Sequence, residues 1–369
     1  MKGRLALAAA AIAGAGALAA CGSAVPVTSA PESQQPVTSA PLATSLSTAQ
    51  DSWAILPMAT NPAFWQVFVR PAASQAWRLV TPPGVADNGG LVAAGTGGTL
   101  TVAFRPSQDL TFSPLATSAN GGRAWSTGLL DADVASTPGA LAASGSQRLA
   151  LLDNGAIMAS SNAGGTWRTL AAAGALADSP AGRRCGAVGV TEVSFGISQG
   201  EVLAAGTCGA AGSGVFAYSA GTWRQLSVPV SGNVVRMMPG LVLVASGARL
   251  YAAWDTASGW PVSAPLAAGN VVASGSLGPD GAWALLPGRH AATIAGPGQP
   301  WRSLPVVPAG TSVLAAGPGG VVDALAVSGS KVTVWRLGAD AGGSGAGGAA
   351  TGWSAIQTIG VPIQYGSSS

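Results

Sequence analysis

One stretch of the chain has the residue types and spacing of a serine hydrolase. Residues 196–200 read Gly-Ile-Ser-Gln-Gly and match the pattern GxSxG, in which a sharp turn exposes a nucleophilic serine, here Ser198. The only histidine of the chain, His290, lies further along, and Asp255 and Asp280 come between the two. This order of nucleophile, acid and base suits ester hydrolysis, which is the first chemistry to consider.

The residues around Ser198 do not favour that chemistry. The pattern needs a strand before the serine and a helix after it, whereas residues 201–206 are typical of another strand. His290 stands beside Pro287 and Gly288, as solvated loop residues commonly do. A serine esterase using Ser198 is therefore kept as one alternative, beside a plain β-turn at residues 196–200.

The first 21 residues have the three parts of an export signal. A cationic start over residues 1–4 precedes an apolar stretch over residues 5–18, which is too short to span a hydrocarbon core of about 30 Å. The sequence Leu-Ala-Ala-Cys at 18–21 then resembles the lipobox of bacterial lipoproteins. The resemblance implies cleavage before Cys21, a diacylglyceryl group on its thiol, and anchoring to the outer face of the cell membrane. The alternative is an ordinary N-terminal helix, or a plain secretory signal in which Cys21 is incidental.

The next segment is rich in Ser, Thr, Pro, Ala and Gln, and the sequence Val-Thr-Ser-Ala-Pro at 27–31 recurs at 37–41. Such a segment cannot bury enough apolar surface to offset the entropy lost on ordering, so we predict a disordered tether. The sequence thus divides into a signal peptide over 1–20, a lipidated linker over 21–50 and a folded domain over 51–369.

The two remaining cysteines, Cys185 and Cys208, are predicted to form a disulfide. In an exported chain two cysteines usually pair, and these two flank a predicted hairpin over residues 192–206, so both could lie at its open end. A closure of this size contributes roughly 3 kcal/mol in the loop-entropy model. The alternative is two free thiols. No CxxC spacing or nearby histidine points to a zinc site, and we expect no metal or cofactor.

The charge composition of the chain bears on which kinds of partner it could bind. Charged residues make up 8% of the chain, and loss of Lys2 and Arg4 with the signal leaves 15 basic against 14 acidic residues. A nearly neutral mature chain gives no support for a nucleic-acid partner. The 54 glycines and 25 prolines are typical of many short strands joined by frequent turns.

An internal repeat extends through the folded domain. Similar short segments begin at Trp77, Trp125, Trp167, Trp223, Trp260, Trp301 and Trp353. Their mean spacing is about 46 residues, and an apolar, Ala-rich run ending in glycine, such as residues 91–95, precedes most of them. Trp335 is a further candidate, which leaves the number of repeats open by one. If the repeats close into a ring, residues 53–56 are expected to be an N-terminal strand that closes this ring against the last repeat.

Residues 148–170 are the clearest repeat. They read as a strand over 149–152, a turn over 153–155, a returning strand over 156–160, and a second turn that leads into Trp167. One such meander cannot bury both its faces, so several must stack. Units of 40–50 residues, each a small antiparallel sheet, are typical of a β-propeller. We therefore predict an all-β fold: a single propeller of seven four-stranded antiparallel blades.

Two turns sharpen this prediction. They fit the pattern Ser-x-Asp-x-Gly-x-Thr-Trp with Asn in place of Asp, and the matching residues are Ser118, Asn120, Gly122 and Trp125, then Ser160, Asn162, Gly164 and Trp167. Asn can close such a turn with its side chain, and Gly supplies a positive φ. The chain thus resembles the Asp-box (BNR) propellers, a group that includes sialidases, sortilin-type receptors and photosystem-II assembly-type propellers. The resemblance implies structural turns and carries no catalytic residue.

Because the group includes sialidases, the chain is compared with the residues that sialidase chemistry requires. Those enzymes need three arginines on the substrate carboxylate, a tyrosine nucleophile with a glutamate partner, and an acid/base aspartate. The chain has Tyr218, Tyr251 and Tyr365, and beyond the tether its only glutamates are Glu192 and Glu201. Tyr218 and Tyr251 lie in predicted strands among apolar residues, where a core role is expected, and no arginine motif of the group is found.

The prediction for function follows from these observations. We expect a lipoprotein outside the cytoplasm whose propeller acts as a non-catalytic binding or assembly module, with a protein or glycan ligand at one face of the ring. A sialidase-like or other glycoside hydrolase is the first alternative, and the GxSxG esterase is the second.

Overall fold

The structure is a computed structural model of the chain. It describes residues 43–48, 51–58, 61–72, 74–82, 88–96, 98–106, 115–126, 138–198, 200–209, 212–338 and 352–362. The chain divides into two units, Met1–Gln35 and Pro36–Ser369, and the first lies wholly outside the described residues. The expected signal peptide, Cys21 and most of the tether also lie outside the described residues. In the described part, no helix has the length and apolar character needed to cross a membrane.

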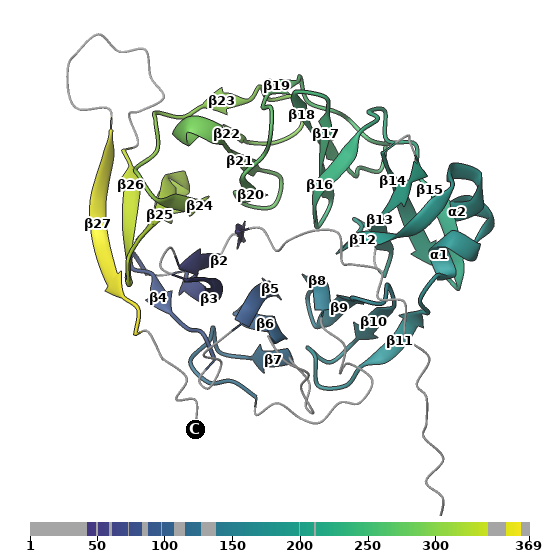
Figure 1. Cartoon of the computed structure of the whole chain (residues 1–369), viewed down its shortest axis with the longest axis horizontal. Helices are drawn as coiled ribbons and strands as arrows, with labels where there is room; N and C mark the ends of the chain where they lie inside the picture. Colours follow the sequence, from purple (N-terminus) through teal and green to yellow (C-terminus); the bar gives the residue numbers. More distant parts are fainter. Residues whose placement is uncertain are drawn as a thin grey trace, which may run out of the picture. The chain divides into compact units, whose positions relative to one another are not determined.

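Within the second unit, seven antiparallel sheets are arranged around a ring, each formed by strands that are consecutive in sequence (Figure 1). The predicted seven-bladed, all-β propeller is confirmed. The strands of blades 1 to 3 are β1 (Thr44–Ser47), β2 (Ser52–Met58), β3 (Asn61–Arg70) and β4 (Arg78–Leu79); β5 (Asn88–Thr96), β6 (Thr99–Pro106) and β7 (Leu115–Ser118); and β8 (Pro138–Ser144), β9 (Gln147–Leu152), β10 (Ile157–Ser160) and β11 (Arg168–Ala171).

Blades 4 to 7 repeat the same order from the inner to the outer strand. Their strands are β12 (Ala187–Phe195), β13 (Val202–Cys208), β14 (Ser213–Ser219) and β15 (Thr222–Gln225); β16 (Asn233–Met238), β17 (Leu241–Ser246), β18 (Arg249–Trp254) and β19 (Leu266–Ala267); β20 (Ala273–Ser276), β21 (Ala282–Leu286), β22 (His290–Ile294) and β23 (Arg302–Ser303); and β24 (Thr311–Ala316), β25 (Val322–Ser328), β26 (Lys331–Leu337) and β27 (Trp353–Gly360).

Two details differ from the sequence-based expectation. The first strand begins at Thr44, inside the segment 21–50 that was assigned to the disordered tether, because its side chains find partners on other blades. Blade 2 has three strands in the described part of the chain rather than four. The backbone N–H of Ser126 donates to the carbonyl of Thr117 on β7, which is the edge that a fourth strand pairs with in the other blades.

The core consists of layers between neighbouring blades. Ala204 and Ala205 are consecutive residues of β13. Ala204 packs in one cluster with Leu149 on β9, whereas Ala205 packs in another cluster with Val242 on β17. Alternate residues of one strand therefore face the two neighbouring blades. Because both faces are buried, the strand reads as a continuous apolar run rather than as an alternating pattern.

The repeated tryptophans begin the outer strands. Trp77, Trp167 and Trp301 directly precede β4, β11 and β23, and Trp353 is the first residue of β27. Several indole N–H groups then donate to the preceding blade around the ring; the pairs are Trp125 with the Val80 carbonyl at 2.8 Å, Trp301 with Ser263 Oγ at 3.2 Å, Trp353 with the Pro305 carbonyl at 3.4 Å, and Trp77 with Asp323 Oδ2 at 3.0 Å. At these four positions the repeated tryptophan thus joins its blade to the preceding one by a hydrogen bond.

The N-terminal strand β1 lies at the inner side of the ring against blades 6 and 7. Thr44 Oγ1 donates to the Ser274 carbonyl on β20 at 2.6 Å, and Ser45 Oγ donates to the Leu314 carbonyl on β24 at 2.5 Å. The approach is so close that a Cβ on Gly275 would meet the Ser45 backbone. Residues 53–56, expected to close the ring against the last repeat, belong to β2 and pair with β1 and β3 inside blade 1.

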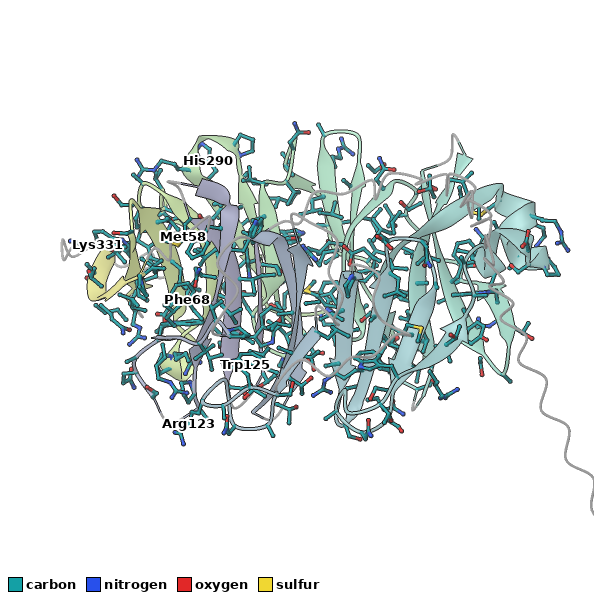
Figure 2. All side chains as sticks on the ribbon, turned by 60° about the horizontal axis from the view of Figure 1, so that its bottom comes forward. Met58, Phe68, Arg123, Trp125, His290 and Lys331 are labelled. Carbon is teal, nitrogen blue, oxygen red and sulfur yellow. A yellow bond between two sulfur atoms is a disulfide. The ribbon has the colours of Figure 1, made fainter. Side chains whose placement is uncertain are left out.

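The alternation of strand direction defines two faces of the ring. One face, here called the Asn-turn face, carries the connections from first to second and from third to fourth strands, including residues 119–124 and 161–167. The other, here called the His290 face, carries the connections from second to third strands. Figure 2 shows Arg123 and Trp125 at one face and His290 at the opposite one.

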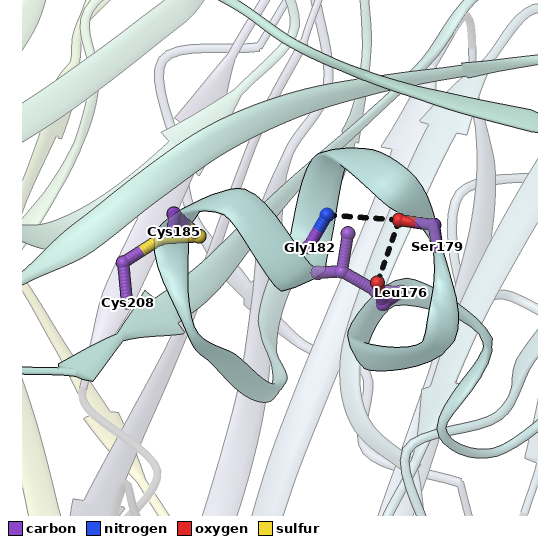
Figure 3. The surroundings of a disulfide bond; sticks show 5 residues. All are labelled: Leu176, Ser179, Gly182, Cys185 and Cys208. Atoms are coloured by element: carbon purple, nitrogen blue, oxygen red, sulfur yellow. Dashed lines mark hydrogen bonds between the residues drawn. A yellow bond between two sulfur atoms is a disulfide. The ribbon is translucent and has the colours of Figure 1, made fainter.

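Two short helices that were not predicted join blade 3 to blade 4. They are α1 (Ala175–Asp178) and α2 (Pro180–Cys185), and Ser179 caps α2 by accepting a 2.9 Å hydrogen bond from the Gly182 N–H. Cys185 at the end of α2 forms the predicted disulfide with Cys208 at the end of β13, which is confirmed (Figure 3). The bond fastens the helical connection to the open end of the hairpin formed by β12 and β13.

Candidate functional site

A cavity of about 130 Å³ lies at the centre of the ring. Its wall comes from the inner strands β1, β5, β8, β12 and β16, with two residues of β2. Small and apolar side chains such as Ala93, Ala140 and Ala142 form much of that wall. Inner strands converge near the ring axis, where space is limited, although longer side chains such as Trp53 and Met237 also line the cavity. Ala93, Ala94 and Gly95, from the Ala-rich run over residues 91–95, thus belong to the cavity wall.

The cavity wall also contains one ion pair. Arg236 Nη1 on β16 lies 3.6 Å from Glu192 Oε1 on β12, and the two side chains are 17% and 16% exposed. Glu192 and Arg236 are the only ionisable side chains among the described residues that line the cavity. Burial raises the pKa of the Glu192 carboxyl, although the charge of Arg236 and a hydrogen bond from the Met237 N–H act in the opposite direction.

Several polar atoms of the cavity wall lack a hydrogen-bond partner. Trp53 Nε1, Ser194 Oγ and Arg236 Nε are buried, and within the described part of the chain nothing accepts from or donates to them. Buried polar atoms in folded proteins are nearly always paired, with protein, water or a ligand. Because Trp Nε1 and Arg Nε can only donate, the wall is suited to a group that accepts hydrogen bonds.

Ser198 lies outside this cavity, in the turn that joins β12 to β13. Its carbonyl accepts from the Glu201 N–H at 3.1 Å, and the Gly196 N–H donates to the Glu201 carbonyl at 3.0 Å, which closes a hairpin. A strand follows the serine, so the strand–turn–helix context of a nucleophile is absent. Ser198 belongs to the Asn-turn face, whereas His290 begins β22 at the opposite face. The structure does not bring these two residues together.

The glycosidase residues do not gather at the cavity either. Arg236 is the one arginine among its lining residues, and no tyrosine lines it in the described part of the chain. Tyr218 donates to the Leu170 carbonyl at 2.8 Å and packs on Trp223 with ring centroids 4.8 Å apart. Glu201 lies 3.4 Å from Arg224 near the surface. The structure does not describe Tyr365.

The two Asn turns share a set of hydrogen bonds made by their Ser and Asn side chains. In the second, Ser160 Oγ donates to Asn162 Oδ1 at 2.8 Å, and that oxygen also accepts from the Thr166 N–H at 2.9 Å. Ser160 Oγ accepts from the N–H of Gly164, whose φ of 92° is left-handed. The first turn repeats these bonds; its residues are Ser118, Asn120, Gly122 and Ala124. All donors and acceptors lie within the turns, so this geometry holds the hairpin.

Sequence reasoning missed Glu192 and Arg236 as site residues. Each is a charged residue within an apolar strand, in a chain where only 8% of residues are charged. That rarity is the signal that could have identified them, since an isolated charge in a buried strand needs a partner. Sequence reasoning also missed Arg148, which is 1% exposed and donates to Thr99 Oγ1 and Thr101 Oγ1 on the neighbouring blade.

No group of three metal-ligating side chains occurs in the described residues. Cys21 lies outside them, so its lipidation remains a prediction.

No protein-family model matches the chain, and no curated protein matches it either. Solved structures do. YCF48 bound to a D1 peptide is 15% identical, with 82% of this chain and 94% of that chain covered at a TM-score of 0.50; YCF48 from Cyanidioschyzon merolae is also 15% identical, with 82% and 96% covered at 0.50. A putative 6-phosphogluconolactonase from Bacteroides uniformis is 11% identical, with 86% and 98% covered at 0.51. These identities are low, so the likeness shows a shared architecture alone: this chain is similar to other β-propellers.

Proposed function

We propose that the chain is a bacterial lipoprotein, anchored by a lipid on Cys21 to the outer face of the cell membrane, whose propeller is a non-catalytic binding or assembly module. The composition of the cavity wall carries the binding part of this proposal. A largely apolar wall with a few unpaired donors suits recognition of a ligand. The residue sets required for glycoside or ester hydrolysis lie apart from one another in the described chain.

Three observations support the finer points. The Cys185–Cys208 disulfide suits an oxidising compartment outside the cytoplasm. The hydrogen bonds of the two Asn turns support membership of the Asp-box propeller group. Among the similar folds, YCF48 is described as bound to a D1 peptide, and a protein ligand is the partner that we propose here.

Site-specific photocrosslinking tests the binding module. A photoreactive amino acid replaces Thr191, which lines the cavity, or Thr169, which is exposed on the outer strand β11. The lipoprotein is then irradiated on intact cells and purified. We expect a discrete protein adduct from position 191 and none from position 169. The proposal fails if neither position gives an adduct, or if both positions give the same adducts. A glycan adduct at position 191 would show that the ligand is a glycan and not a protein.

Fatty-acid labelling tests the anchor separately. Cells fed an alkyne-tagged fatty acid should label the wild-type chain, whereas the Cys21→Ser variant should carry no label and leave the membrane fraction. Cys21 is the sole cysteine outside the disulfide, so a Cys185→Ser/Cys208→Ser variant that keeps its label is the matched control. Equal labelling of the Cys21→Ser variant contradicts the lipoprotein assignment.

A further inference from the structure

We infer that the central cavity binds an organic carboxylate, held by Arg236 and Ser194. This inference rests on the proposed function and deepens it, since it names the chemical group that the binding module recognises. The carboxylate could belong to a free small acid or to the C-terminus of a peptide, and the experiment below separates these two sources.

Ser194 provides the first reason. Its side chain is 1% exposed, lines the cavity, and its Oγ has no hydrogen-bond partner within the described part of the chain. Leaving a buried hydroxyl unsatisfied is energetically costly, so such an atom in a cavity indicates a missing partner. An oxygen of a bound carboxylate can accept the hydroxyl proton.

Arg236 provides the second reason. Its Nη1 lies 3.6 Å from Glu192 Oε1, beyond hydrogen-bond range, and its Nε has no partner. A guanidinium presents its donors as a planar fork that matches a carboxylate with two parallel hydrogen bonds. Here the fork is only loosely paired, so a second carboxylate can bind to it.

Charge balance gives Glu192 a role in this binding. The wall carries one positive and one negative side chain, so an entering carboxylate leaves one excess negative charge unless Glu192 takes up a proton. Burial already raises the pKa of Glu192, which favours that uptake. Arg236 and the Met237 N–H are the groups that oppose it, and no other ionisable side chain lines the cavity in the described chain.

The size of the cavity limits the ligand to a small group. One water needs roughly 10–15 Å³ of such space, and the cavity has about 130 Å³. The space therefore exceeds one water several times, which is enough for a carboxylate with a few attached atoms.

Calorimetric titration of the purified full-length lipoprotein in detergent tests the inference. The probes are N-acetylglycine and N-acetylglycinamide, which differ in the carboxylate alone. We expect the acid to bind at least about tenfold more tightly than the amide, because only the acid offers the charged acceptor. Tetraglycine with a free or an amidated C-terminus forms the second arm: binding of free tetraglycine identifies a peptide terminus as an accepted source, and binding of N-acetylglycine alone identifies a small acid.

Two serine variants provide the matched control. Ser194 and Ser274 both lie on inner strands, both are buried, and both hydroxyls lack a partner, but only Ser194 lines the cavity. Ser194→Ala should weaken binding of the acid about fivefold or more, and Ser274→Ala should leave it unchanged. Arg236→Gln should abolish it. In Glu192→Gln, binding of the acid should no longer vary with pH, whereas the wild type should bind the acid more tightly as the pH falls.

The inference is overturned if no acid binds, if acid and amide bind equally, or if Ser194→Ala binds as the wild type does. The serine variants decide the matter even if Arg236→Gln fails to fold. Because the titration uses no cellular partner, absence of carboxylate binding overturns this inference alone, whereas the photocrosslinking result at Thr191 bears on the proposed function.

Discussion

The indole N–H of Trp77 donates a 3.0 Å hydrogen bond to Oδ2 of Asp323, across 246 positions of the sequence. Both side chains are buried, and Arg336 donates to the same carboxylate from Nε at 2.7 Å and from Nη2 at 3.0 Å. Gln357 adds two hydrogen bonds to the Trp77 backbone. Among the described strands none is shared between blades 1 and 7, so this group of side chains is a principal link between the two ends of the ring.

Replacing Asp323 should therefore destabilise the whole propeller. Asp323→Ala leaves the Trp77 indole without its acceptor and the Arg336 guanidinium with only Gln75, and loss of one partner of a buried ion pair costs at most about 3–5 kcal/mol. Asp323→Asn keeps one acceptor oxygen and should cost less. Urea unfolding of the purified chain measures both changes.

The control for Asp323 is the ion pair between the exposed Arg224 and Glu201. Arg224 is 67% exposed, so Arg224→Ala should change stability by about 0.5 kcal/mol or less. Equal effects at the two sites contradict the assignment of Asp323 to ring closure.

The propeller and its outer strands could be predicted because they follow from repeated local features. Each blade needs similar turns and similar apolar strands, and residues 148–170 show them in sequence order. The helices α1 and α2 interrupt the repeat and have only the Ser179-Pro180 cap as a signal. The Trp77–Asp323 contact and the Glu192–Arg236 pair join distant segments, and one sequence has no local pattern that specifies such pairing.

Loss of the disulfide should lower stability without changing the fold. The bond joins residues 23 positions apart, and closing a loop of that length contributes about 3 kcal/mol. The Cys185→Ala/Cys208→Ala variant should unfold at a correspondingly lower urea concentration and keep its circular dichroism spectrum. Adding a reductant should destabilise the wild type and leave the variant unaffected; an equal response of both to the reductant contradicts the pairing.

The two Asn turns offer a matched stability test. Asn162 Nδ2 donates to Thr166 Oγ1 at 3.0 Å, whereas the first turn has Ala124 at the corresponding position and cannot form that bond. Asn162→Ala should therefore cost more than Asn120→Ala, by about 0.5–1 kcal/mol. Ala124→Thr should stabilise the chain by a similar amount, because the position is exposed and the hydroxyl gains an amide donor. Thermal unfolding measures all three changes, and a destabilising Ala124→Thr contradicts this account.

Glu192 should make stability depend on pH in a defined direction. Burial raises its folded-state pKa above the ordinary 4.5, so the folded chain binds a proton more tightly than the unfolded chain does. The stabilising contribution of this proton is fully present below pH 4.5 and is lost as the pH rises through the folded-state pKa, with a slope of at most about 1.4 kcal/mol per pH unit.

The Glu192→Gln variant isolates this contribution, because glutamine does not titrate. Urea unfolding of wild type and variant between pH 4.5 and pH 8 should show the wild type losing stability relative to the variant as the pH rises. Glu201→Gln is the control, since that carboxylate pairs with an exposed arginine outside the cavity. Parallel curves for wild type and Glu192→Gln across this range contradict a buried carboxyl in the cavity wall. A wild type that gains stability relative to the variant with rising pH shows instead that Arg236 outweighs burial.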